Sequence, residues 1–171
     1  KLELLEAIDK SKDAELAKQS AALRVEGTTT EAFKEALFGG NNWEGRNIFL
    51  SNSTAQCVRC HTIGSEGGTV GPSLQRIGKT LTREQILQAL IEPSARLAPG
   101  YGTVQVTLTD GQDVTGILLA DNDHEMEIKT SEAEPLRVPL SRIKSRQNFP
   151  SSMPAMGSVL SKREIRDVVE F

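Results

Sequence analysis

The chain has few of the residues that bind metals and few of those that stack on bases. Of its 171 residues, two are cysteine, two are histidine and 4% are aromatic. A structural zinc site takes four ligands, so it would use nearly all of the cysteines and histidines. The stretch at about 101–146 carries no basic stripe or aromatic platform, which argues against RNA or DNA binding. No apolar run approaches membrane-spanning length, so we expect no membrane insertion by this segment.

Neither sign of charge dominates the chain. It carries 20 Lys and Arg against 23 Asp and Glu, a formal net charge of −3. No single-sign patch in the sequence predicts strong electrostatic steering of a partner. The length suits one core with an accessory lobe.

The scarce cysteines lie together with one of the histidines, since Cys57, Cys60 and His61 form a Cys-x-x-Cys-His run. This run is typical of c-type haem attachment. Two thiols one helical turn apart can add to the two vinyl groups of one haem, and the next imidazole can reach its iron. Zinc binding and dithiol redox chemistry are the alternatives. The second ligand pair of a zinc knuckle is missing, and the glycine-rich stretch 62–68 is not the long helix that a thioredoxin-like motif requires.

An iron bound by His61 needs a ligand on its other side. Met126 alternates with polar neighbours as in a half-buried strand, so we expect it to fill a core. His124 follows a turn signal and is expected in solvent. Met153 and Met156 lie in a loop rich in Pro, Gly and Ser before the final helix. We favour Met153, because the proline after it would stiffen its approach, and Met156 stays the alternative.

The stretch between the helix ending near residue 93 and the methionine loop has the pattern of strands. Val104 and Val106 alternate with polar neighbours, and a turn at Asp110-Gly111 leads to a second apolar run. Two further short strands follow, the last at an edge because it contains a proline. We expect a small antiparallel sheet or half-barrel at about 101–146, and interpret it as a cover for the methionine side of a haem.

Four helix starts are predicted by a capping pattern, in which a Thr, Asn or Ser is followed three positions later by a Glu or Gln. The four pairs are Thr28 with Glu31, Asn41 with Glu44, Thr82 with Gln85, and Ser161 with Glu164. Gly45, one turn before Phe49, would let its helix cross the final helix closely, although this spacing also suits generic packing.

Residues 1–38 carry apolar side chains at roughly helical spacing in otherwise charged sequence. We expect an N-terminal helical extension or linker there, outside the haem-binding part. The chain begins without an initiator Met and ends inside an apolar helical pattern, so we expect it to be part of a longer polypeptide.

Taken in order, several motifs resemble the class I-like c-type cytochrome domains, of the variety found at the C-terminus of large secreted, quinoprotein-type sugar or alcohol dehydrogenases. The resemblance covers most of residues 39–171 and rests on Gly39-Gly40-Asn41, Glu44 to Phe49, Cys57 to His61, Gly67 to Leu74, Pro99-Gly100-Tyr101 and Met153-Pro154. It implies a mainly α, cytochrome c-like helical haem domain with the small antiparallel sheet inserted.

The resemblance also assigns roles to residues. It implies that Cys57 and Cys60 hold haem c covalently, that His61 is the proximal ligand and that Met153 is the distal one. The carbonyl of Pro72 would accept a hydrogen bond from the second ring nitrogen of His61, which would orient the imidazole and raise its basicity.

The expected function is electron transfer, without conversion of a substrate, so we expect no enzyme activity in this segment. A His and Met ligand pair raises the haem potential relative to two imidazoles. Redox partners would be a dehydrogenase as donor and an oxidase or another cytochrome as acceptor. Covalent haem implies a periplasmic location, with the signal or anchor outside this chain. The alternatives are a haem-based ligand sensor or peroxidase-like enzyme with an open iron site, and an interaction module that uses the β insert.

Overall fold

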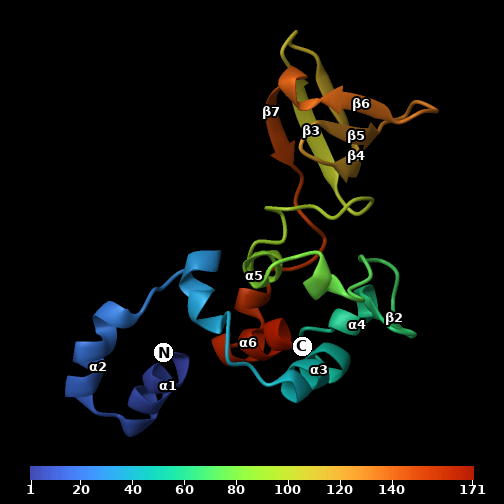
Figure 1. The fold of residues 1–171 in the computed structure, drawn as a ribbon. Helices are drawn as coiled ribbons and strands as arrows, with labels where there is room; N and C mark the ends of the chain where they lie inside the picture. Colours follow the sequence, from blue (N-terminus) through green and yellow to red (C-terminus); the bar gives the residue numbers. More distant parts are fainter. The chain divides into compact units, whose positions relative to one another are not determined.

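Residues 1–171 of the computed structural model divide into a helical unit and a sheet unit (Figure 1). The helical unit comprises Lys1–Glu92 and Ala155–Phe171, and the sheet unit comprises Pro93–Pro154. The helices are α1 (Leu2–Ser11), α2 (Ala14–Ser20), α3 (Asn42–Ser51), α4 (Cys57–Cys60), α5 (Arg83–Ile91) and α6 (Lys162–Glu170). The strands are β1 (Thr62–Ile63), β2 (Glu66–Gly67), β3 (Thr103–Leu108), β4 (Asp113–Asp121), β5 (Glu125–Lys129), β6 (Leu136–Pro139) and β7 (Ile143–Asn148). None of the helices combines the length and apolar character needed to cross a membrane.

Three of the four predicted capping residues begin helices. Thr82 and Ser161 form capping boxes at the starts of α5 and α6. The side-chain oxygen of Asn41 accepts hydrogen bonds from two backbone N–H groups in the first turn of α3. The prediction for Thr28 is wrong, because the following segment, Thr30–Ala36, is a short 3₁₀ helix without a side-chain cap.

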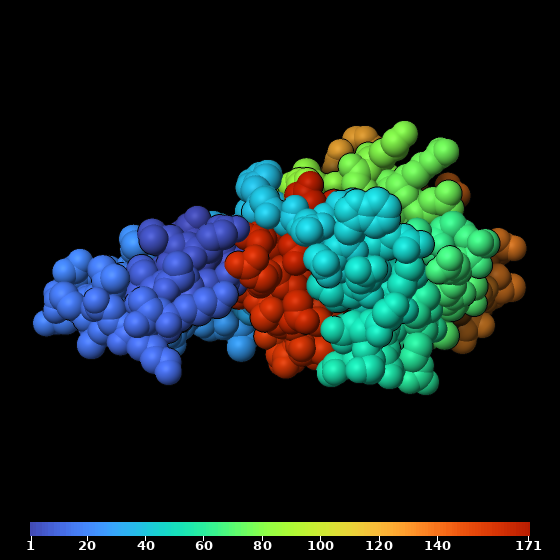
Figure 2. All heavy atoms as spheres, turned by 90° about the horizontal axis from the view of Figure 1, so that it is seen from below, coloured from blue at the N-terminus to red at the C-terminus, as the bar shows by residue number.

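The close crossing of α3 and α6 that Gly45 predicted is confirmed. A Cβ at Gly45 would collide with the backbone carbonyl of Asp167. The same aspartate accepts a hydrogen bond of 2.8 Å from the backbone N–H of Asn41, and the rings of Phe49 and Phe171 lie 5.9 Å apart. Figure 2 shows α6, in red, directly against the cyan α3. The helix α3, which precedes the turn of Cys57 and Cys60, is thereby anchored to α6.

The N-terminal helix α1 belongs to the helical unit. Glu3 forms an ion pair with Arg166, and Glu6 forms one with Arg163, so two acids one turn apart meet two bases of α6. The apolar residues of α1 are buried: Leu2, Leu5 and Ile8. In Figure 2 the blue N-terminal segment lies beside the red α6. The predicted helical character of residues 1–38 is confirmed, whereas the domain boundary after residue 38 stays a prediction.

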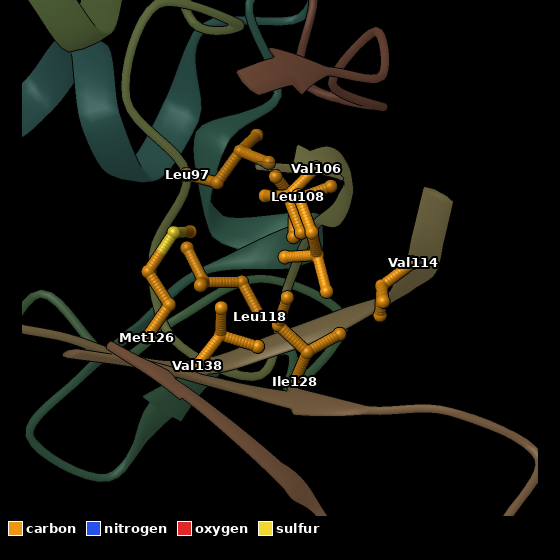
Figure 3. Packing of buried hydrophobic residues seen from close by; sticks show 9 residues of the cluster. Leu97, Val106, Leu108, Val114, Leu118, Met126, Ile128 and Val138 are labelled. Carbon is orange, nitrogen blue, oxygen red and sulfur yellow. The ribbon is translucent and has the colours of Figure 1, made fainter. Parts of the chain in front are cut away.

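The sheet unit is an antiparallel sheet with the strand order β6-β5-β4-β3-β7. Its core is formed by inward-facing side chains (Figure 3): Leu97, Val104, Val106, Leu108, Val114, Leu118, Met126, Ile128 and Val138. The predicted alternation around Val104 and Val106 is therefore correct, and the strand that contains Pro139 is an edge strand as expected.

The prediction of a mainly α, cytochrome c-like fold is wrong. About 40% of the chain is helical and 20% is strand, and the five-stranded sheet is accompanied by the small sheet β1-β2. The physical reason is that the residues predicted as an insert bury an apolar core of their own. They form a second compact unit.

Candidate functional site

The two cysteines lie at the two ends of the short helix α4. The backbone N–H of His61 donates a hydrogen bond of 3.0 Å to the carbonyl oxygen of Cys57, which closes the turn. Cys57 is half-buried and Cys60 is exposed, and both are free thiols. Because they are three positions apart on one helical turn, their side chains lie on the same face of α4, and His61 follows directly.

The imidazole of His61 is oriented by Pro72. Its Nδ1 lies 2.8 Å from the carbonyl oxygen of Pro72. A carbonyl oxygen can only accept, so Nδ1 carries the proton, and Nε2 of the neutral ring keeps a lone pair for a metal ion. The hydrogen bond that the resemblance predicted between these residues is therefore present.

The loop after His61 folds back on the motif through its glycines. Gly68 donates a backbone hydrogen bond of 2.9 Å to Val58, and Gly71 donates one of 2.8 Å to Cys60. A Cβ on Gly71 would lie 2.8 Å from Cε1 and 2.9 Å from Nδ1 of His61. The loop can support the imidazole only because this position has no side chain. We did not predict this role for Gly71, although its place before Pro72 was a usable signal.

Apolar side chains around the motif are only partly buried. Between Phe49 and Leu87 no residue is buried, although the core residues on either side are nearly inaccessible. The larger half-buried apolar residues in this stretch are Leu50, Val58, Ile63, Leu74, Ile77, Leu81 and Ile86. Partly exposed apolar side chains lack contacts that a flat, largely apolar ring could provide. Together with the two free thiols and the imidazole lone pair of the same segment, they fit a covalently held haem.

The structure disfavours both dithiol redox chemistry and a structural zinc site. Burial, and then the neighbouring Cys60, raise the pKa of Cys57, whereas the attacking cysteine of a dithiol redox motif has a lowered pKa. A structural zinc site takes four ligands, and the structure has no group of even three His, Cys, Asp or Glu side chains that could hold a metal ion.

The structure brings together four of the five predicted site residues, namely Cys57, Cys60, His61 and Pro72. The fifth, Met153, is half-buried and lies at the end of the sheet unit, Pro93–Pro154.

The other candidate ligands have different surroundings. Met156 is 3% exposed and begins a 3₁₀ helix that packs against α5 in the helical unit. A methionine in such a core position is a filling residue. Met126 is 1% exposed in the core of the sheet and His124 is exposed in a turn, so both of these predictions are confirmed.

Comparison with known proteins found no family model that matches the chain and no curated protein similar enough to count as a match.

Proposed function

We propose that this chain is an electron carrier with one covalently attached haem c. Cys57 and Cys60 would hold the haem through thioether bonds, and Nε2 of His61 would be the proximal ligand. The observation that carries this proposal is the 2.8 Å hydrogen bond between Nδ1 of His61 and the carbonyl of Pro72. It selects the tautomer with a free Nε2, and a bond of this kind orients a metal-bound imidazole and increases its basicity.

The residues of the site would keep the ligand set fixed during electron transfer. When bound, the haem iron supplies a one-electron redox couple. The backbone of Gly71 lies close to the ring of His61, and the hydrogen bond to Pro72 prevents the ring from rotating. The partly buried apolar residues around the motif would keep water away, which is one of the means by which a protein sets a haem potential.

The distal ligand in this proposal is Met153, on the grounds of the loop in which it lies and of the buried position of Met156. Its thioether would raise the potential relative to a second imidazole. Such a potential suits a dehydrogenase as electron donor and an oxidase or another cytochrome as acceptor, with docking through a small surface. Covalent haem points to assembly and function in the periplasm.

The experiment is expression together with the periplasmic haem-attachment machinery. Mass spectrometry of the peptide that contains Cys57 and Cys60 should show one added haem, which acid-acetone extraction does not remove. The ferric protein should be low-spin, with the weak far-red band of a methionine bound to iron. Either Cys57→Ser or Cys60→Ser should leave one thioether, and the two substitutions together should abolish covalent attachment.

The two histidines provide a matched pair of variants. His61→Ala should lose the low-spin spectrum, because the proximal ligand is removed, whereas His124→Ala should keep it, because this side chain is exposed in a turn. A protein that acquires no haem would refute the proposal. Attached haem with a high-spin spectrum in the unmodified protein would favour the ligand sensor or peroxidase-like enzyme.

A further inference from the structure

The segment that carries Met153 has little structure of its own. Residues 149–155 contain no helix or strand, and Pro150 and Pro154 have no N–H to donate. Two hydrogen bonds hold the backbone between these prolines. The N–H of Ser151 donates to Oγ of Ser94 (3.0 Å), and the N–H of Met153 donates to Oγ of Ser151 (3.1 Å). The position of the methionine therefore depends on a serine 59 residues earlier in the chain.

A second group ties the same two parts of the chain together. Asn148, the last residue of β7, is half-buried. Its Nδ2 donates to the backbone carbonyls of Ser94 (3.0 Å) and Ala95 (3.2 Å), while its Oδ1 accepts from Nε of Arg146 (2.9 Å). Carbonyls can only accept and a guanidinium can only donate, so the amide has one orientation that satisfies all three contacts.

The side-chain amide of Asn148 is linked to β4 through Arg146. Arg146 forms an ion pair of 2.6 Å with Asp121 at the end of β4. Leu97, which follows Ser94 closely in sequence, is 6% exposed and packs in the sheet core. The segment before β3 and the segment after β7 are therefore both held by the same sheet.

We propose that Ser94 and Asn148 are positioning residues for the loop of Met153, and that the sheet unit serves to hold this loop. The inference rests on the proposed function, in which Met153 is the distal ligand. The hydrogen bonds limit the conformations of the loop, so the thioether loses less freedom when it binds iron. One such bond contributes a factor of about two to ten to the ratio of ordered to free loop.

The test is competition by imidazole in the ferric, haem-loaded protein. Added imidazole can bind only when Met153 leaves the iron, so its apparent affinity reports the stability of the closed loop. Ser94→Ala should increase this affinity about two- to tenfold. Asn148→Asp should increase it more, because a carboxylate oxygen would then face two carbonyls without a donor. Ser94→Thr keeps the hydroxyl and should behave like the unmodified protein.

Ser152→Ala is the matched control, because Ser152 is exposed in the same loop and makes none of these hydrogen bonds. Amide hydrogen exchange of Ser151 and Met153 provides a second readout, and should be faster in Ser94→Ala than in Ser152→Ala. The inference is overturned if Ser94→Ala matches Ser152→Ala in both measurements while the unmodified protein shows the methionine band. Absence of that band in the unmodified protein counts against Met153 as ligand, and hence against both proposals, whatever the exchange rates.

Discussion

Replacing Gly71 by alanine tests the core of the proposed site with one methyl group. The backbone of Gly71 is not in the left-handed region, so alanine can adopt its conformation without strain. The new Cβ would lie 2.8 Å from Cε1 and 2.9 Å from Nδ1 of His61, closer than such contacts occur in proteins. Either the imidazole or the loop must therefore move.

The size of the effect follows from the two ways in which the contact can be relieved. If the ring turns, it loses its hydrogen bond to Pro72, which costs about 0.5–1.5 kcal/mol. If the loop moves, the cost is that of overpacking, about 1–3 kcal/mol. A less firmly hydrogen-bonded imidazole is also a weaker donor to the iron. We therefore expect Gly71→Ala to lower the stability of the haem-loaded protein by about 1–3 kcal/mol and to raise its reduction potential.

The assay is urea unfolding followed by haem absorbance, together with a potentiometric titration. For a slope of about 1–3 kcal/mol per molar urea, the midpoint should fall by roughly 1 M. Gly78→Ala is the matched control, because a Cβ at Gly78 would meet nothing within 4 Å and its φ is not positive. If both variants have the same midpoint and the same potential, the imidazole does not rest on Gly71 and the description of the site is incorrect.

Three further predictions concern other parts of the helical unit. Gly45→Ala should unfold this unit or weaken it by several kcal/mol, because the Cβ would meet backbone atoms of α6 that cannot move aside; a thermal midpoint equal to that of the unmodified protein would contradict the close crossing. The hydrogen bond from Arg163 lowers the pKa of Glu6 below its ordinary value of 4.5, so the stability that the pair contributes is present above pH 4.5 and is lost as the pH falls through the lower folded-state pKa. Acid unfolding by circular dichroism should thus be less steep for Glu6→Gln, and identical curves would exclude this contribution. In the haem-free protein, iodoacetamide should label Cys60 before Cys57, because burial raises the pKa of Cys57; peptide mapping that finds equal rates would show that burial does not protect this thiol.

The helical turn that carries Cys57 and Cys60 could be predicted from the sequence because its geometry is local. The two cysteines and the histidine are at most four residues apart, so the turn of α4 alone sets their arrangement. The capping boxes at Thr82 and Ser161 were predictable for the same reason, since each joins a side chain to a backbone group three residues away. The pair at Thr28 failed because a capping pattern does not by itself supply the packing that a full helix needs.

The roles of the methionines show where sequence patterns stop being sufficient. Met126 was predictable as a core residue because alternation along a strand reports burial. Met153 and Met156 lie three positions apart, and the proline after Met153 is the one local feature that separates them. The structure gives them different surroundings, because Met156 is buried in the helical unit while Met153 belongs to the sheet unit.

The sequence by itself determined the Cys-x-x-Cys-His turn, most of the helix starts and the strands around Val104, because each depends on contacts between residues a few positions apart. Only the tertiary structure decided the fold class, since whether the strands form a compact unit with a core of its own depends on where their apolar faces are buried. It also decided which distant groups meet, such as α1 with α6 and Asn148 with Ser94. Such contacts arise from the packing of whole elements, and no spacing along the chain encodes them.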